Sequence, residues 1–208
     1  MTKELKTEVE KVSYALGMDV GFSFESLPAE IDIDSLIQGI SDISKGETPL
    51  LDEKEFAAEM QQFQAKMQEK REEMQSEATE VNQGLGDTYL AENQAREGVT
   101  VTESGLQYEV LVEGDGVIPT ADKSVTVHYT GSLIDGTVFD SSVERGEPAT
   151  FPVNGVIQGW IEALQLMAEG SKFRLVIPSN LAYGERGAGQ QIGPHSTLVF
   201  EVELISVN

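Results

Sequence analysis

The first 98 residues carry apolar side chains at the spacing of helices rather than of strands. Near the N-terminus these side chains recur every three or four residues, which places them on one face of a helix. They are Leu5, Val9, Val12 and Leu16. Gly17 and Gly21 interrupt the tail of this predicted helix, where they either weaken its end or let the backbone of another helix come close.

A second helix is predicted to begin near Asp32 or Asp34 and to end at Gly46, because acidic caps and glycine are typical of the two ends of a helix. Its apolar face consists of Ile33, Leu36, Ile37, Ile40 and Ile43. Both helices are short and apolar, and the chain around them is too small to form a core of its own. Two copies that exchange these helices would bury them, so the pattern predicts a homodimer.

The third segment, residues 53–97, is predicted to be one long helix that starts after a cap at Asp52. About 45 helical residues span roughly 70 Å, which exceeds the width of a small domain. The helix must therefore protrude into solvent or pack along a partner, and Gly84 and Gly86 are candidates for softening it locally.

A sparse apolar stripe runs along this long helix at the spacing of heptads. It consists of Phe56, Met60, Phe63, Met67, Met74, Ala78, Val81 and Leu85. We interpret the methionines as flexible filling of a core, with a groove for client chains as the alternative.

The pattern changes near Gly98 to the alternation that is typical of strands. Strands are predicted at residues 105–114, 124–133, 149–153, 172–177 and 197–207. One helix interrupts them, with Val156, Ile157, Trp160, Ile161 and Leu164 on one face. Antiparallel strands wrapped over one helix define an α+β fold. The chain is therefore divided into a helical domain, residues 1–98, and an α+β domain, residues 99–208.

Composition narrows the function classes. The formal net charge of −22 argues against nucleic acid, whose phosphates require clustered Lys and Arg. The chain has no cysteine, which excludes disulfides and thiol chemistry, and with only two histidines we expect no metal site and no cofactor. No stretch approaches the roughly 20 apolar residues that cross a bilayer, and the first residues lack the apolar run of a signal peptide. We therefore expect no membrane contact and a cytoplasmic location.

Conventional catalytic motifs are absent from the sequence. It contains no Walker loop, no Rossmann glycine pattern, no His-Glu-x-x-His and no Gly-x-Ser-x-Gly. His128 lies within a predicted strand and His195 follows a proline in a loop. We interpret both as hydrogen-bonded structural residues rather than as general bases.

Five short sequence motifs follow one another in a distinctive order in the C-terminal half. They are Val-His-Tyr-Thr-Gly at 127–131, Asp-Gly-Thr-Val-Phe-Asp-Ser-Ser at 135–142, Val-Ile-Gln-Gly-Trp at 156–160, Ile-Pro-Ser-Asn-Leu-Ala-Tyr-Gly at 177–184, and residues 192–204. Together they closely resemble the FKBP family of peptidyl-prolyl cis-trans isomerases. The helical half, followed by Gly-Leu-Gln-Tyr at 105–108, more narrowly resembles the bacterial macrophage infectivity potentiator (Mip) branch, whose members are typically homodimers joined through their N-terminal helices.

The resemblance implies a half-barrel around the helix of Trp160, with a hydrophobic pocket for a prolyl residue. Trp160 would be the floor of this pocket, and Arg145 and Ile192 join its substrate-binding residues. The walls would be Tyr129, Phe139, Val156, Ile157, Tyr183 and Phe200.

The resemblance also implies roles. Trp160 and Phe139 would hold the proline ring. The Tyr183 hydroxyl and the Ile157 N–H would donate to substrate carbonyls. Asp140 would orient the rotating amide, with its carboxylate fixed by Tyr129 and Arg145.

The expected partners are proline-containing unfolded or partly folded chains, and macrolide inhibitors are further candidates. Ala149, Ala188 and Gln191 depart from many eukaryotic relatives and make the pocket rim more open and more polar. The alternative from another class is a chaperone module that binds chains without turnover, although the complete set of pocket residues argues against it. A purely structural coiled coil would leave the C-terminal motifs unexplained.

Overall fold

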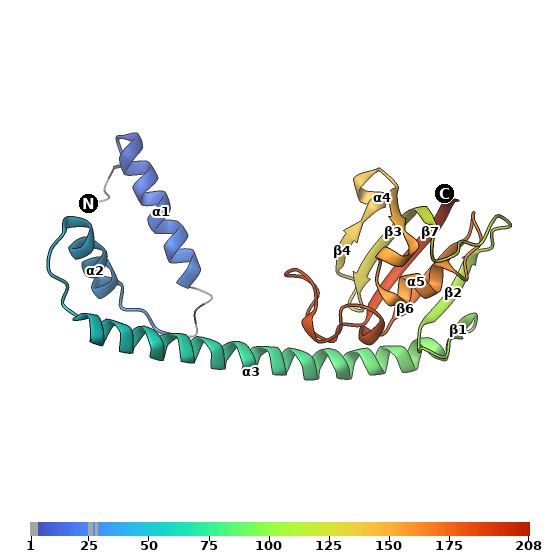
Figure 1. Ribbon diagram of the computed structural model, residues 1–208, viewed down its shortest axis with the longest axis horizontal. Helices are drawn as coiled ribbons and strands as arrows, with labels where there is room; N and C mark the ends of the chain where they lie inside the picture. Colours follow the sequence, from blue (N-terminus) through green and yellow to red (C-terminus); the bar gives the residue numbers. More distant parts are fainter. Residues whose placement is uncertain (1–3, 25–26, 28) are drawn as a thin grey trace. The chain divides into compact units, whose positions relative to one another are not determined.

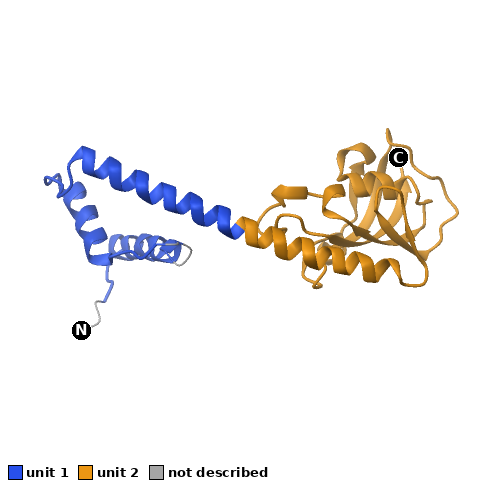
Figure 2. Ribbon diagram, turned by 90° about the horizontal axis from the view of Figure 1, so that it is seen from below, with its two compact units in different colours: residues 1–74 blue, residues 75–208 orange. Residues whose placement is uncertain are grey.

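The computed structural model describes residues 4–24, 27 and 29–208. These residues form two compact units, 1–74 and 75–208 (Figure 2). Helix α3, Glu53–Gln94, crosses the division, so its C-terminal part belongs to the second unit. The predicted domain division at residues 98 and 99 follows the change from helical to strand spacing, whereas the division at 74 and 75 follows contacts between residues.

The first unit contains α1, Glu8–Phe24, and α2, Ile33–Lys45. The side chain of Thr7 accepts a hydrogen bond from the Glu10 N–H at 3.2 Å, and Glu10 accepts one from the Thr7 N–H at 2.9 Å. This reciprocal cap sets the start of α1, so Leu5 precedes the helix and is not part of its face. The helix continues through both glycines that were expected to interrupt it.

The predicted ends of α2 are confirmed. Asp32 caps the first turn by accepting a hydrogen bond from the Ser35 N–H at 2.8 Å. Gly46 ends the helix in the left-handed conformation with φ 70°, which glycine adopts without steric cost. Asp52 likewise accepts hydrogen bonds from the N–H groups of Lys54 and Glu55, both at 2.8 Å, and so caps α3 as predicted.

The apolar faces of the first unit are exposed. Among the described residues, α1 has no buried residue and α2 buries only Asp42. Val9 is 75% exposed and Ile43 is 68% exposed. The single chain therefore leaves these apolar faces in solvent.

The second unit contains an antiparallel sheet in the order β1-β2-β6-β7-β3-β4, with β5 also paired to β3 (Figure 1). The strands are β1 Val99–Val101, β2 Gln107–Val112, β3 Ser124–Leu133, β4 Val138–Ser141, β5 Ala149–Pro152, β6 Lys172–Ile177 and β7 Leu198–Val207. The short helix α4, Ser142–Arg145, follows β4, and α5, Gln158–Leu164, lies against one face of the sheet. The predicted α+β class is confirmed.

Several element boundaries differ from the prediction. β1, β4 and α4 were not predicted, since each is only three or four residues long and too short for a period to stand out. The strand predicted at 105–114 is shorter, because Gly105 occupies a turn with φ 93°. Val156 and Ile157 precede α5, and Ile157 is its N-cap.

The core lies between α5 and the inner face of the sheet. α5 contributes Trp160, Ala163 and Leu164, and β3, β6 and β7 contribute alternate side chains. The alternation places every second residue of a strand on one face, as in β7, where Leu198, Phe200, Val202 and Leu204 are buried. Further fully buried members of this core are Leu106, Val125, Val127, Val153, Met167, Leu175 and Ile177.

The C-terminal part of α3 lies on the outer face of the sheet, opposite α5. On β6, Phe173 is buried in the core, whereas its neighbour Arg174 points to the other face and donates a hydrogen bond to Asn93 of α3 at 2.8 Å. Asn93 also donates to the side chain of Gln107 on β2 at 2.8 Å. These buried polar contacts fasten the helix to the sheet.

The last aliphatic residues of the predicted apolar stripe are exposed in the single chain. Val81 is 52% exposed and Leu85 is 55% exposed, and the buried residues of the helix are Gly86 and Asn93. The helix meets a sheet face that carries Arg174 and other polar groups, so small and polar residues complement that face better than aliphatic residues do.

Candidate active site

Aromatic side chains from three elements meet around Trp160 of α5. Its indole ring is only 4% exposed. It contacts the rings of Tyr129, Phe200 and Phe151 edge to face, at centroid distances of 5.3, 5.4 and 6.1 Å. Edge-to-face pairs are a preferred aromatic geometry, so the cluster forms a rigid apolar surface. The indole N–H has no hydrogen-bond partner among the described residues.

The position of Trp160 depends on a close approach between α5 and β6. A Cβ atom on Gly159 would lie 2.5 Å from a methyl carbon of Ile177. Only glycine at this position therefore lets the first turn of α5 lie directly on β6. Ile157 accepts hydrogen bonds from the N–H groups of Trp160 and Ile161 at 2.9 and 3.0 Å, which starts the helix.

A second glycine makes room for the aromatic wall. Gly131 faces inward on β3, where a Cβ atom would lie 2.6 Å from the ring of Phe200 and 2.8 Å from the ring of Phe139. These two rings pack edge to face above it, with centroids 5.6 Å apart. Gly131 is thus required for Phe139 to reach the cluster.

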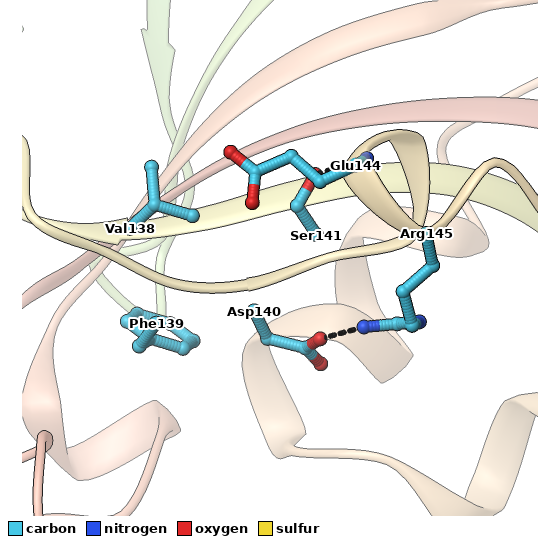
Figure 3. A pocket seen from close by; sticks show the side chains of 6 residues that line it. All are labelled: Val138, Phe139, Asp140, Ser141, Glu144 and Arg145. Atoms are coloured by element: carbon cyan, nitrogen blue, oxygen red, sulfur yellow. Dashed lines mark hydrogen bonds and ion pairs between the residues drawn. The ribbon is translucent and has the colours of Figure 1, made fainter.

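A β-bulge places two consecutive residues of β4 on the same side. Gly131 of β3 pairs with Asp140, and Ser132 pairs with Val138, so Phe139 is an extra residue in the register. Bulges change the direction of side chains in this way and are frequent beside active sites. Figure 3 shows Phe139 and Asp140 on one side of β4 and Val138 on the other.

Asp140 is held by two donors. The Tyr129 hydroxyl donates to one carboxylate oxygen and the Arg145 guanidinium donates to the other. Arg145 also donates to the Tyr129 oxygen at 3.1 Å, and its Cζ lies 5.7 Å from the centre of that ring. The three side chains therefore form a closed clamp that fixes the carboxylate.

Local structure delivers Arg145 to this clamp. Ser141 accepts a hydrogen bond from the Glu144 N–H at 3.2 Å and caps α4. Gly146 ends this single turn in the left-handed conformation with φ 73°. The turn between the cap and the glycine carries Arg145 back beside Asp140.

The clamp sets the ionisation of its members. Burial raises the pKa of Asp140, but the hydrogen bonds from Tyr129 and Arg145 outweigh burial, so this pKa lies below its ordinary value. Burial, together with the hydrogen bond to Asp140, raises the pKa of the Tyr129 phenol. The pair is therefore a carboxylate and a neutral phenol at neutral pH.

Three other predicted site residues pack beside this centre. Val156, Ile157 and Ile192 are half-buried and pack against the core cluster. The backbone N–H of Ile157 has no acceptor among the described residues. Tyr183 lies between the short helices η2, Ser179–Leu181, and η3, Gly184–Arg186, and is 40% exposed.

A hollow of about 300 Å³ adjoins the clamp (Figure 3). Its lining residues are Val138, Phe139, Asp140, Ser141, Glu144 and Arg145. It shares Phe139 and Asp140 with the aromatic centre but does not include Trp160 or Tyr183. We place the site at the aromatic centre, because the buried rings and the orphan N–H groups lie there.

Three residues of this site were missed from the sequence. Phe151 on β5 packs against Trp160 and against Tyr129. Ser142 accepts a hydrogen bond from the Tyr129 N–H at 2.8 Å and so holds the strand beside α4. Gly131 makes the close approach described above, and a glycine at an inward position of an alternating strand was a usable signal.

The two histidines are hydrogen-bonded, in agreement with the structural interpretation. His128 Nδ1 lies 3.1 Å from the Ser142 hydroxyl, and His195 Nδ1 lies 3.1 Å from the side-chain nitrogen of Gln83. In the part of the chain that the structure describes, no group of three or more acidic or histidine side chains could hold a metal ion. None of the described helices is both long and apolar enough to span a membrane.

The fold and the aromatic site define the class of protein. The family model of the FKBP-type peptidyl-prolyl cis-trans isomerases matches residues 116–205, and that of the domain amino-terminal to it matches residues 9–110. The chain belongs to the FKBP-type family and is a peptidyl-prolyl cis-trans isomerase.

Full-length relatives support this assignment. The chain is 48% identical over 207 residues to the FKBP-type 22 kDa peptidyl-prolyl cis-trans isomerase of Escherichia coli strain K12, covering 99% of this chain and 98% of the relative. It is 43% identical to the outer membrane protein MIP of Legionella longbeachae, covering 98% and 87%. The crystal structure of FkpA from Escherichia coli is similar with a TM-score of 0.75 and 36% identity, covering 99% of each chain.

Proposed function

We propose that the aromatic centre binds the proline ring of the substrate, with Trp160 beneath it and Phe139 beside it. The observation that carries this proposal is the coincidence of a buried aromatic cluster with a fixed carboxylate, which the bulge at Phe139 and Asp140 creates. Such a surface accepts an apolar ring, while the carboxylate is a fixed polar group that orients the substrate.

This chemistry requires no proton transfer. Rotation about a peptide bond crosses a barrier of about 18–20 kcal/mol, because resonance is lost as the amide twists. An enzyme accelerates the step by binding the twisted amide more strongly than the planar one. Removing about 4–7 kcal/mol from the barrier speeds the step by roughly three to five decades.

We assign the polar roles to groups with unused hydrogen-bonding capacity. The half-exposed Tyr183 and the Ile157 N–H donate to substrate carbonyls on either side of the bond. Asp140 faces the twisting amide and stays ionised because the clamp lowers its pKa. Val156, Ile192 and Phe200 complete the apolar walls.

Substitutions at the pocket test these assignments by the catalysed isomerisation of a short Xaa-Pro peptide. Asp140→Asn should lower kcat/KM by about ten- to a hundredfold, since a hydrogen bond to a charged group is worth about 1.5–3 kcal/mol. Phe139→Ala should lower it by a similar factor, since burying an apolar side chain such as Phe is worth about 1.5–3 kcal/mol. Glu144→Gln is the matched control, because Glu144 lines the adjoining hollow but has no assigned role. Unchanged turnover in both pocket variants would refute the assignment.

We also propose that the chain is a homodimer joined through α1 and α2. The support is the exposure of their apolar faces, in which Val12 is 54% exposed, Leu16 63%, Ile37 58% and Ile40 58%. Soluble monomers rarely leave apolar patches of this kind uncovered. A second copy of the same helices supplies a complementary apolar surface.

The dimer would bind unfolded or partly folded clients in a chaperone-like manner. Once one pocket of the dimer holds a client chain, the second pocket is present at a high effective concentration for the same chain. Proline-limited refolding of a test protein should therefore be accelerated more than short-peptide turnover predicts.

The test uses the double variant Ile37→Glu, Ile40→Glu in the full chain. Its control, Ser35→Glu with Ser44→Glu, adds the same charge to exposed polar positions of α2. Light scattering should give a dimer for the control and a monomer for the apolar-face variant, which should lose refolding acceleration but keep peptide turnover. A monomeric wild-type chain would contradict the proposal.

Two further assignments stay predictions. A cytoplasmic location is testable by cell fractionation, whereas the Legionella longbeachae relative is named as an outer membrane protein. Macrolide binding is testable by quenching of Trp160, the single tryptophan of the chain. The rim residues Ala188 and Gln191 would weaken such binding, since Gln191 is exposed and polar.

A further inference from the structure

Helix α3 contacts a loop that belongs to the pocket. Asn82 is half-buried, and its side-chain nitrogen donates to the Pro194 carbonyl at 2.7 Å. The same nitrogen lies 3.5 Å from the Ser196 hydroxyl. One turn further along, Gly86 is buried against Thr197.

The fit between helix and loop is tight on both sides. A Cβ atom on Gly193 would lie 2.9 Å from the side-chain nitrogen of Asn82, and one on Gly86 would lie 2.6 Å from the Thr197 hydroxyl. A larger residue at either glycine would therefore displace the side chain that it faces. This contact is specific rather than an incidental touch of two surfaces.

The loop that Asn82 holds is a closed unit. Ala188 and Ile192 exchange backbone hydrogen bonds of 2.8 and 3.1 Å at its tip, and the His195 N–H donates to the Gly184 carbonyl at 2.8 Å at its base. His195 is the single non-glycine residue with positive φ in the described chain, at 54°. Such backbone conformations persist where surrounding contacts fix them.

The loop also carries pocket residues. Tyr183 immediately precedes its base, and Ile192 packs from its tip against the core cluster. Pro194 lies between the tip, closed by hydrogen bonds at Ile192, and the base, closed by a hydrogen bond at His195. A displacement of the Pro194 carbonyl would therefore displace Ile192.

The helix is a rigid support for this loop. Asn93 and Gln107 are buried and hydrogen-bonded to each other, and Gln107 donates to the Leu90 carbonyl at 3.0 Å. Arg174 donates to Asn93 and to the Tyr89 hydroxyl at 2.8 and 2.7 Å. A satisfied buried network of this kind rigidifies the elements that it joins.

We propose that Asn82 is a positioning residue of the isomerase site: through Pro194 it holds the loop of residues 184–195 in the place where Ile192 and Tyr183 contact the substrate. This inference rests on the pocket assignment made above. It makes the C-terminal part of α3 a component of substrate binding, although the helix touches no substrate.

The first test compares Asn82→Ala and Asn82→Asp with wild type in the full chain, by kcat and KM for a short Xaa-Pro peptide. The aspartate has the shape of asparagine but no N–H donor. Both variants should raise KM by about three- to tenfold, the equivalent of one net hydrogen bond, with kcat within about twofold, because binding rather than the rotation step is affected. The control Gln75→Ala removes an exposed amide from the same helix.

Hydrogen exchange separates positioning from general stability. Exchange of the amides at 184–195 should accelerate in both Asn82 variants, while amides of β6 and β7 keep their wild-type rates. Equal acceleration in the loop and in the strands would assign Asn82 a structural role only and overturn the proposal. An unchanged KM in Asn82→Asp would overturn it as well.

A second substitution changes the loop side of the contact between Asn82 and Gly193. Gly193→Ala should raise KM in the wild-type background, because the new methyl group displaces the Asn82 amide. In the Asn82→Ala background the same change should cost little, since the amide is gone and the space is free. Additive effects in this cycle would contradict a direct contact between the two positions.

Different results would refute the pocket assignment and the positioning role of Asn82. If Phe139→Ala and Asp140→Asn keep full turnover, the pocket is elsewhere, whatever happens at Asn82. If those two variants lose turnover while the Asn82 variants retain wild-type KM and loop exchange, only the positioning role is wrong.

Discussion

The two compact units use apolar residues in opposite ways. In the second unit the aliphatic and aromatic side chains of β3, β6, β7 and α5 are buried around Trp160. In the first unit the equally regular apolar faces of α1 and α2 are mostly in solvent. Periodicity therefore identifies the face that will be buried, but not whether the same chain buries it.

The same contrast divides α3. Its first part carries an apolar stripe with Phe56 58% exposed and Met60 40% exposed. Its last part contacts the pocket loop through Asn82 and Gly86 and the sheet through Asn93, and leaves Val81 and Leu85 exposed. One continuous helix thus has two kinds of contact surface, an apolar one without a partner in the single chain and a polar one with a partner.

The largest expected effect tests the difference in burial. Leu175→Ala removes a side chain that is 1% exposed, and should lower the free energy of unfolding by about 2–5 kcal/mol. Ile40→Ala on α2 should change the unfolding of the second unit by less than about 0.5 kcal/mol. Denaturant unfolding followed by Trp160 fluorescence measures both, and equal effects would mean that the units unfold as one.

A smaller effect tests the polar attachment of α3. Asn93→Ala removes the partner of the Gln107 side-chain oxygen and one acceptor of Arg174, and should cost about 1–3 kcal/mol. Gln94→Ala, on the exposed side of the same turn, should be neutral. Hydrogen exchange of α3 residues 82–94 should rise in the first variant only, and protection equal to wild type would show that the network does not hold the helix.

The smallest effect concerns the clamp at Asp140 and appears as a pH dependence. The folded-state pKa of Asp140 is lowered. The clamp therefore stabilises the folded protein fully above the unfolded-state pKa of Asp140, and this stabilisation is lost as pH falls through the folded-state pKa. Wild-type kcat/KM should therefore stay level from pH 8 down to about 4, near the ordinary pKa of aspartate.

Arg145→Ala sharpens this prediction. The variant removes a hydrogen bond and a positive charge that lower the pKa of Asp140, whereas burial, which raises it, remains. The acid limb of the pH profile should therefore move to higher pH, with a modest loss of activity at pH 7. Glu144→Gln should leave the limb in place, and an unmoved limb in Arg145→Ala would mean that Asp140 does not control it.

Much of the fold could be read from local patterns. The caps at Asp32 and Asp52, the end of α2 at Gly46 and the long strands were predicted, since each depends on neighbouring residues. The short elements β1, β4 and α4 were not, because a strand or helix of three or four residues has no period of its own. Their bounds are decided by pairing with β2 and β3.

In the candidate site, too, some features could be predicted from the sequence and others could not. Tyr129 and Trp160 could be placed on a strand and a helix from spacing and resemblance. The resemblance also placed Phe139 and Asp140 in one pocket, but the strand pattern could not show how they converge, because in a regular strand adjacent residues point to opposite faces.

The sequence alone determined which long segments are helices and which are strands, because these follow from local periodicity. The resemblance of its ordered motifs to a known family supplied the candidate side chains of the pocket. Only the tertiary structure decided that a bulge turns Phe139 and Asp140 to one side and that α3 meets the sheet and the pocket loop through Asn82, Gly86 and Asn93. The physical reason is that register and close approach depend on partners distant in the chain, and their cost or gain is set by the shape of both surfaces.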